Sequence, residues 1–114
     1  ERQMPFALPS PACFENVSVD CKANVYFDGK VVSHTIRLAS GERKTLGLIF
    51  PGAYSFNTGA AECMEIIAGN CRARLPGEAD WKDYPAGTFF TIPANASFEI
   101  AVDAGVAEYV CSFE

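Results

Sequence analysis

The segment that decides the fold covers residues 47–69 and reads GLIFPGAYSFNTGAAECMEIIAG. It contains an alternating segment that ends at the Pro51-Gly52 turn, a second alternating segment with Tyr54 and Phe56, and an apolar segment that begins at Glu62. Alternation of apolar and polar residues is typical of half-buried strands, and a Pro-Gly pair marks a turn. The segment therefore predicts three consecutive short strands.

The sequence on both sides continues this pattern. Asp28-Gly29 is a strong hairpin signal, because its turn needs positive φ. A strand is expected over residues 19–27, with one face made of Cys21, Ala23, Val25 and Phe27, and another over residues 30–38, with one face made of Val32, His34, Ile36 and Leu38. Further strands are expected at residues 43–50, 62–68, 71–75, 87–92, 98–102 and 106–113, and no segment predicts a helix convincingly. Many short strands with regularly spaced turns predict an all-β fold, here a single-domain jelly-roll β-barrel.

The chain of 114 residues has the length of one domain. Its beginning, residues 1–13, contains three prolines and lacks periodicity. Proline fixes φ and removes a backbone donor, so these residues are expected to form an extended N-terminal arm. The barrel domain is expected to cover residues 14–114.

Composition and charge exclude several classes of function. The net charge is −5, and no window concentrates lysine and arginine, so a nucleic-acid-binding surface is not expected. No run approaches the ~20 apolar residues of a membrane span. The five cysteines are odd in number and form no C-x-x-C pair, which favours reduced thiols in a cytoplasmic protein over a disulfide framework or a zinc site.

The spacing of Gly47, Tyr54, Phe56, Glu62 and Gly69 resembles the first motif of the cupin superfamily, which has a glycine, a His-x-His pair, a glutamate and a closing glycine. The spacing of Gly87, Pro93, Asn95 and Phe98 resembles the second motif, which normally ends in a third histidine. The resemblance implies a cupin barrel in which Tyr54, Phe56 and Phe98 replace metal-binding histidines. Divalent metals need imidazole, thiolate or several carboxylates, so we expect no metal and no cofactor.

A closer resemblance covers most of the chain. The phrases that carry it are NVYFDGKV (24–31), TLGLIFPGAYSFNT (45–58), ECMEIIAG (62–69), the lone Trp81, AGTFFTIPANASF (86–98) and YVCSF (109–113). Together they look like the small, single-domain, cupin-type pyrimidine/purine nucleoside phosphorylase family. This resemblance implies a pentosyltransferase that uses inorganic phosphate to split purine and pyrimidine nucleosides into free base and ribose 1-phosphate. It also implies broad base tolerance and a homodimer.

Candidate site residues follow from the chemistry of phosphorolysis. Glu62 is the candidate catalytic residue, because a carboxylate can hydrogen-bond ribose hydroxyls or stabilise a developing positive charge. Flat apolar side chains accept any base by stacking, and the candidates are Tyr54, Phe56, Met64 and Phe98. Phosphate calls for arginine, lysine or hydroxyl groups, and the candidates are Arg43, Lys44, Thr45 and Thr58.

Two alternatives remain open from the residues alone. Arg43 and Lys44 are neighbours in an expected strand and point to opposite faces, so at most one enters the barrel, and Arg43 is slightly preferred. Aromatic residues that alternate along a strand are often ordinary core residues, so Tyr54, Phe56 and Phe98 could pack the core instead of binding a base. A non-enzymatic cupin that binds a small molecule would keep the same aromatic pocket and Glu62 without turning over nucleosides.

Overall fold

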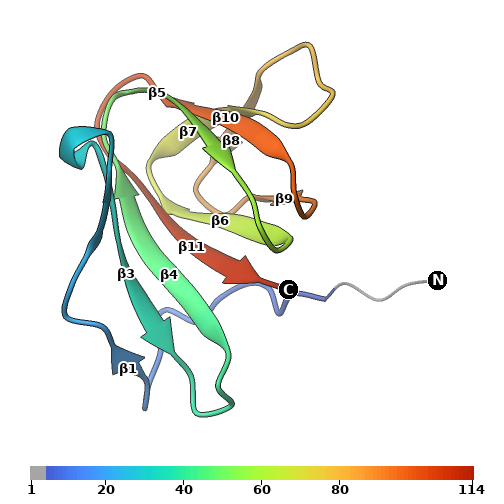
Figure 1. Cartoon of the computed structure of the whole chain (residues 1–114). Helices are drawn as coiled ribbons and strands as arrows, with labels where there is room; N and C mark the ends of the chain where they lie inside the picture. Colours follow the sequence, from blue (N-terminus) through green and yellow to red (C-terminus); the bar gives the residue numbers. More distant parts are fainter. Residues whose placement is uncertain (1–4) are drawn as a thin grey trace.

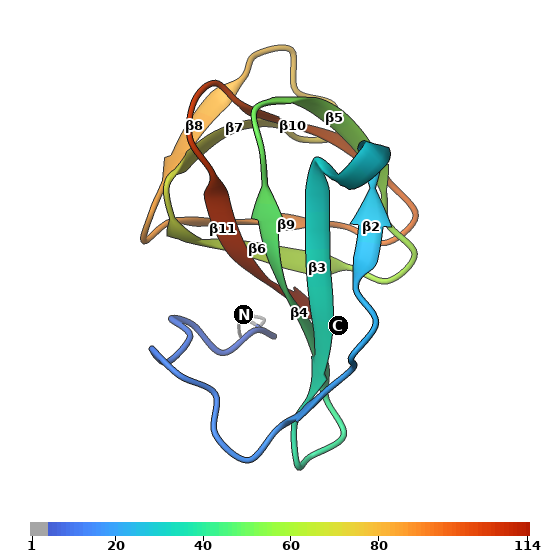
Figure 2. The ribbon, with the colours of Figure 1, turned by 90° about the vertical axis from the view of Figure 1, so that its left-hand side faces the viewer.

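The computed structural model describes residues 5–114, so the first four residues of the expected arm lie outside the described part of the chain. Two antiparallel sheets pack together, with the smaller sheet above the strongly curved larger one (Figures 1 and 2). The all-β prediction is confirmed, since the one helical segment within residues 5–114 is the short 3₁₀ turn η1 (Phe27–Gly29). No helix in this described part is long and apolar enough to cross a membrane.

The larger sheet has seven strands in the order β1-β3-β4-β11-β6-β9, with β2 paired to β3. The smaller sheet has four strands in the order β5-β10-β7-β8. The bounds in the larger sheet are β1 (Ser18–Val19), β2 (Asn24–Tyr26), β3 (Val31–Arg37), β4 (Arg43–Ile49), β6 (Glu62–Ala68), β9 (Phe89–Ile92) and β11 (Ala107–Phe113). Those in the smaller sheet are β5 (Gly52–Asn57), β7 (Asn70–Arg74), β8 (Lys82–Pro85) and β10 (Ser97–Val102).

Alternation along the strands decides what fills the space between the sheets. On β4, Gly47 and Ile49 are buried, whereas Leu46 and Leu48 are exposed on the outer face. On β10, Phe98 and Ile100 are buried in the same core cluster as Ile49. Period-two alternation places every second side chain on one face, so the core lies between the two sheets.

Gly47 shows why the first motif needs a glycine. A Cβ atom at this position would lie 2.4 Å from the ring of Tyr109, which belongs to the neighbouring strand β11. Tyr109 is Cα-paired with Gly47 and lies across it inside the barrel. The glycine therefore makes room for an aromatic ring rather than for a turn.

The expected strand at residues 19–27 is wrong as one continuous element. β1 ends at Val19, β2 begins at Asn24, and both pair with different ends of β3. The backbone N–H of Asp20 still donates to Thr35 O at 2.9 Å, and the bend at residues 21–22 then separates β1 from β2. The hairpin predicted at Asp28-Gly29 is confirmed, since β2 and β3 pair antiparallel across η1.

The face of β3 that contains Val32 and His34 looks outward. The inner face of this strand instead holds Val31, Ser33 and Thr35, all buried. Asn24 holds the two hydroxyl groups, because its Nδ2 donates to Ser33 Oγ at 3.2 Å and to Thr35 Oγ1 at 3.1 Å. A polar row therefore faces the interior where an apolar row would be the simplest expectation.

The segment from Pro5 to Val17 contains no helix or strand. Phe6 is buried, and Ser10 donates from its backbone N–H at 2.9 Å and from its hydroxyl at 2.5 Å to the carboxylate of Glu65. Glu65 lies on the outer face of β6, since its neighbour Met64 belongs to the core cluster. These contacts fix the described part of the arm to the outside of the larger sheet.

Candidate active site

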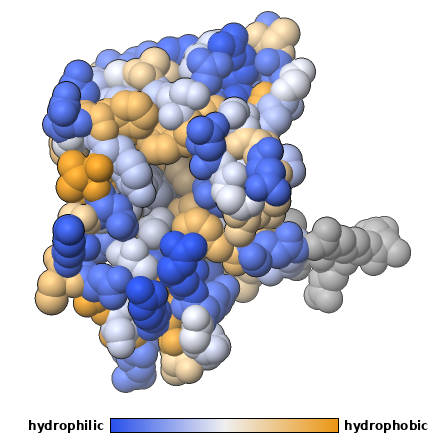
Figure 3. Space-filling model, in the orientation of Figure 1, coloured by the Kyte–Doolittle hydropathy of each residue, from blue (hydrophilic) through white to orange (hydrophobic). Residues whose placement is uncertain are grey.

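A cavity of about 250 Å³ opens between the two sheets. The space-filling view shows a hollow near the centre of the molecule's face (Figure 3). Its lining comes from both sheets and comprises Asn24, Tyr26, Val31, Ser33, Thr35, Arg43, Thr45, Ile49, Phe56, Asn57, Glu62, Met64, Phe98, Ile100, Tyr109, Cys111 and Phe113. Concave sites with an apolar lining and a few convergent polar groups are the usual binding sites for small molecules.

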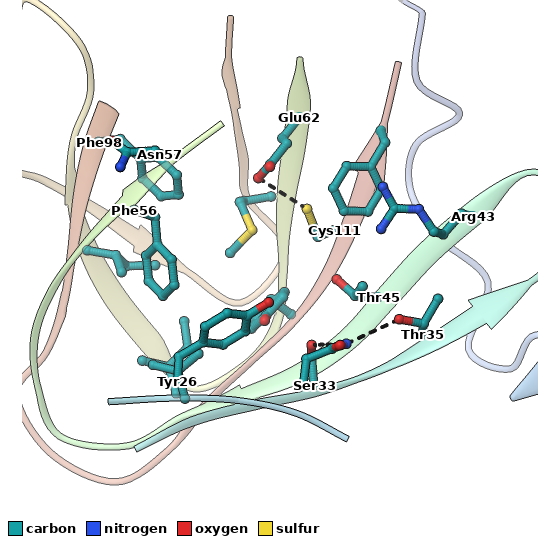
Figure 4. Close-up of a pocket in the computed structure, with 17 residues that line it drawn as sticks. Tyr26, Ser33, Thr35, Arg43, Thr45, Phe56, Asn57, Glu62, Phe98 and Cys111 are labelled. Atoms are coloured by element: carbon teal, nitrogen blue, oxygen red, sulfur yellow. Dashed lines mark hydrogen bonds between the residues drawn. The ribbon is translucent and has the colours of Figure 1, made fainter. Parts of the chain in front are cut away.

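One side of the cavity is an aromatic wall made of Tyr26, Phe56 and Phe98. Phe56 and Phe98 are Cα-paired between β5 and β10, and their rings are stacked with centroids 5.8 Å apart. Tyr26 on β2 meets Phe56 edge to face, also at 5.8 Å. The side chains lie together on one side of the cavity (Figure 4), with Asn57 beside Phe98.

The opposite side is a polar face made of Thr35, Arg43 and Thr45 on β3 and β4. Thr35 and Thr45 are Cα-paired across the two strands. Arg43 lies two residues before Thr45 on β4, on the same inner face. The Arg43 guanidinium stacks on the ring of Phe113, 4.0 Å from its centroid. Figure 4 shows this group across the cavity from the aromatic wall.

Lys44 points the other way, as the alternation predicted. Its Nζ is buried on the outer face, donates to Ser112 Oγ at 2.8 Å and lies 3.6 Å from the Glu42 carboxylate. Of the two neighbouring cations, Arg43 is therefore the one that lines the cavity.

Glu62 begins β6 and lies between the aromatic wall and the polar face (Figure 4). The Cys111 thiol on β11 donates to Glu62 Oε1 at 3.5 Å. Burial raises the pKa of Glu62, and the Cys111 hydrogen bond and the Arg43 charge lower it by less. Burial also raises the pKa of Cys111, with Glu62 adding to the shift, so the sulfur remains a thiol that can donate. The carboxylate thus keeps a free oxygen toward the cavity.

Besides Lys44, two of the candidate site residues lie outside the cavity lining. Tyr54 is buried in the core cluster, and its hydroxyl donates to the backbone oxygens of Phe50 at 2.7 Å and Pro51 at 3.0 Å. Thr58 donates to Pro93 O at 2.7 Å and accepts from Ala96 N at 3.0 Å. Both hydroxyls are used to fix the turns at the ends of β5. The other candidates line the cavity: Arg43, Thr45, Phe56, Glu62, Met64 and Phe98.

Several lining residues were not among the candidates. On β11, Tyr109, Cys111 and Phe113 point inward at every second position, a signal that alternation contains. Asn24 and Tyr26 come from the short strand β2, whose pairing to β3 depends on the η1 turn. Their place in the cavity had no clear signal in the sequence.

The donor atoms in the cavity do not fit a divalent metal of the kind that cupins hold. Phe56 and Phe98 occupy two of the usual ligand positions, and Tyr54 at a third is turned to the backbone. The lining offers one carboxylate and one thiol and no imidazole. Within residues 5–114, no group of three histidine, cysteine, aspartate or glutamate side chains is placed to hold a metal ion.

Comparison with known proteins gives a consistent set of relatives. A family model described as pyrimidine/purine nucleoside phosphorylase matches residues 21–113. Proteins with that name from Methylobacillus flagellatus and Cupriavidus taiwanensis are each 59% identical, over 90% and 89% of this chain and 99% and 95% of their own lengths. A crystal structure of a protein of unknown function from Acinetobacter sp. ADP1 superposes with a TM-score of 0.88 at 40% identity, covering 91% of this chain and 100% of that one.

More distant structures show the fold alone. Oxalate decarboxylase from Bacillus subtilis, a cupin protein, matches with a TM-score of 0.69 at 16% identity, covering 92% of this chain and 30% of that one. The predicted cupin barrel is therefore confirmed.

Proposed function

The chain belongs to the pyrimidine/purine nucleoside phosphorylase family, and we propose that it splits purine and pyrimidine nucleosides with inorganic phosphate, without a metal. The observation that supports this most directly is the division of one cavity into an aromatic wall and a polar face, with the Glu62 carboxylate between them. Such a cavity offers one surface to a base, one to an anion and one charged group to the sugar.

In this proposal the base lies against Phe56 and Phe98. A stacking surface accepts purines and pyrimidines alike, because every base has a π face. Met64 adds a polarisable, adaptable contact to the same region. Broad base tolerance is expected because the Phe56 and Phe98 rings carry no donor or acceptor that would select one base.

The bond changes balance with hydrogenphosphate as the second substrate. A phosphate oxygen forms a bond to C1′ as the C1′–N bond breaks, the base leaves with the electron pair, and the proton of hydrogenphosphate passes to the base. Positive charge develops on the sugar ring before the new bond is complete. The Glu62 carboxylate is placed to stabilise that charge or to accept a hydrogen bond from a ribose hydroxyl.

The test is the release of free base by the purified, EDTA-treated protein. Uridine, adenosine, inosine and guanosine are incubated with and without phosphate, and free base and ribose 1-phosphate are quantified. We expect release that depends on phosphate and is unchanged by EDTA. Release without phosphate would indicate a hydrolase, and loss on EDTA that metal restores would contradict the metal-free mechanism. No release from any nucleoside would favour the non-enzymatic binding cupin.

We also propose that the protein acts as a cytoplasmic homodimer that pairs through the outer face of the larger sheet. An apolar row crosses this face, because Val25 is Cα-paired with Val32 and Val32 with Leu48. Val25 is 60% exposed and Leu48 38% exposed, and nearby Leu46 is 37% exposed. Contiguous exposed apolar surface of this kind is typical of protein–protein contacts. Free, buried thiols such as Cys63 and Cys71 support a reducing compartment.

Sedimentation equilibrium tests the dimer. We expect wild type to sediment at twice the chain mass, and Leu48→Glu to sediment as a monomer. Ser55→Glu, on the exposed outer side of β5, serves as the matched control and should leave the mass unchanged. A monomeric wild type, or a Leu48→Glu protein that stays dimeric, would place the contact elsewhere or remove it.

A further inference from the structure

We propose that inorganic phosphate binds at one defined subsite, the polar face made of Arg43, Thr45 and Thr35. We further propose that Phe113 orients Arg43 and keeps it apart from Glu62. This inference rests on the proposed function, but the binding of phosphate alone tests it separately.

The three side chains form one continuous patch. Thr35 and Thr45 are opposite each other on β3 and β4, and Arg43 is the next inward residue of β4. Residues two apart on a strand share a face, and opposite residues on paired strands have Cβ atoms about 5 Å apart. One tetrahedral oxyanion is of a size to contact all three.

The Thr35 hydroxyl is arranged to donate, and the Thr45 hydroxyl lies within hydrogen-bond reach of the Cys111 sulfur. Asn24 Nδ2 donates to Thr35 Oγ1 at 3.1 Å, so the Thr35 oxygen already accepts a hydrogen bond. A hydroxyl has one proton, and that proton then points away from the Asn24 amide. Both threonines are almost fully buried, with 7% and 8% of their surface exposed, so little water competes for these donors. Hydroxyl donors of low exposure suit an anion better than a neutral group.

Arg43 supplies the charge. It is the one cation among the cavity-lining residues, since Lys44 points to the outer face and bonds Ser112. A guanidinium presents two parallel N–H groups along its edge, which match two oxygens of a phosphate. Stacking on the Phe113 ring at 4.0 Å fixes the plane of the guanidinium and leaves that edge available.

The sheet order explains why Arg43 does not neutralise Glu62. Strand β11 lies between β4 and β6, and its residue Phe113 is Cα-paired with Glu62. The same aromatic side chain therefore touches Arg43 on one side and adjoins Glu62 on the other. Strands in a sheet are about 4.8 Å apart, so the backbones that carry Arg43 and Glu62 are about 10 Å from each other. Phe113 is thus a positioning residue that leaves one charge for phosphate and the other for the sugar.

The experiment measures phosphate in two ways. Phosphate binding without nucleoside is followed by titration calorimetry, and the KM values for phosphate and nucleoside are measured separately. The variants are Arg43→Met, Thr45→Val, Thr35→Val and Phe113→Leu. Arg37→Met is the matched control, because Arg37 is Cα-paired with Arg43 but forms an exposed ion pair with Asp20 outside the cavity. Circular dichroism and thermal unfolding verify that each variant folds.

We expect Arg43→Met to weaken phosphate binding and to raise the phosphate KM by roughly 10- to 100-fold. This is the effect expected from the loss of a charge-assisted, hydrogen-bonded pair. Each threonine variant should cost about 3- to 10-fold in the same two quantities. Phe113→Leu should raise the phosphate KM, since the guanidinium loses its fixed plane. The nucleoside KM should change less than twofold in these variants, and Arg37→Met should match wild type in every measurement.

The outcomes separate the subsite from the proposed function. Phosphate binding that depends on Arg43 in a protein that releases no base supports the subsite and overturns the phosphorylase. If the wild type carries out phosphorolysis but Arg43→Met and both threonine variants leave the phosphate KM unchanged, the subsite is overturned and the proposed phosphorylase activity stands. If the wild type neither binds phosphate nor releases base, both the subsite and the proposed phosphorylase activity are overturned. If folded Arg43→Met raises only the nucleoside KM, Arg43 binds the sugar rather than phosphate, and the subsite is overturned.

Discussion

Glu62→Gln is expected to lower kcat for phosphate-dependent base release by about 100-fold or more. Removing one preorganised group that stabilises transition-state charge typically costs about 10²–10³ in kcat. Glutamine keeps the size of the side chain and can still accept a hydrogen bond from the Cys111 thiol, so the change isolates the negative charge. Steady-state kinetics on the folded variant measures the effect.

The control is Glu65→Gln, which removes a carboxylate from the same strand on its outer face. Glu65 accepts hydrogen bonds from Ser10 and lies outside the cavity lining, so kcat should stay within about twofold of wild type. Wild-type kcat in Glu62→Gln would remove Glu62 from the mechanism.

The pH dependence of the wild-type enzyme carries a second expectation about Glu62. Burial raises the pKa of Glu62, so its proton is lost at a higher pH than from an exposed glutamate. Because the ionised form is the active one, kcat/KM of wild type should fall as the pH drops through this raised pKa, and Cys111→Ala should move the fall to still higher pH. An acid limb that Cys111→Ala leaves in place would contradict the role of the thiol donor.

The raised pKa of Glu62 also affects the stability of the fold, and there ionisation of the carboxyl group is unfavourable. A carboxyl group whose pKa is raised on folding stabilises the protein at a pH below its unfolded pKa, and this contribution is lost as pH rises through the folded pKa. At neutral pH the buried carboxylate therefore costs folding free energy. Glu62→Gln should be at least as stable as wild type at pH 7 while losing activity, which distinguishes a lost charge from a damaged fold.

Gly69→Ala is expected to be the most destabilising of the substitutions considered, by about 3 kcal/mol or more. Gly69 has φ +76°, and a Cβ atom there would lie 2.2 Å from the backbone oxygen of Val106. A left-handed backbone costs a residue with a side chain about 1 kcal/mol, and a clash with backbone cannot be relieved by a rotamer change. Urea unfolding measures the free-energy change.

Gly105→Ala is the matched control for this effect. Gly105 has a similar φ of +71°, but nothing lies within 4 Å of its Cβ position. It should therefore lose about 1 kcal/mol, the backbone cost alone. Equal losses at the two positions would mean that the clash is absorbed by movement of Val106, and the closing glycine of the first motif would then be explained by φ alone.

How far the sequence predicts this site is clearest along β4 and β6. Alternation separated Arg43 from Lys44, and the motif spacing identified Glu62, Phe56 and Phe98 as residues that share an interior. These residues lie on long, regular strands, where period two fixes the face of each side chain relative to its neighbours. Within each strand the local pattern is sufficient, and the motif spacing relates the three strands β5, β6 and β10 to one another.

Tyr54 shows where the pattern stops. It shares a face with Phe56 and is buried, yet it lies at the Pro51-Gly52 end of β5 and donates to the backbone there. Alternation gives the side of a sheet on which a residue lies but not its depth along the barrel. Thr58 lies just beyond the other end of β5, where its hydroxyl closes a turn with Pro93 and Ala96.

The sequence by itself determined the all-β barrel, the family and the inward-facing Glu62, because strand period, turn residues and motif spacing are local properties of the chain. Only the tertiary structure decided that Ser33 and Thr35 face inward, that Asn24 holds their hydroxyls, and that Phe113 lies between Arg43 and Glu62. The Asn24 contacts cross the β2–β3 hairpin, and the Phe113 contacts join strands about 50 to 70 residues apart in the chain. Their formation depends on strand pairing and sheet closure. On β3 the inner face carries Ser33 and Thr35 while Val32 and Ile36 lie on the outer face, so the hydrophobic pattern of that strand does not identify its inner face.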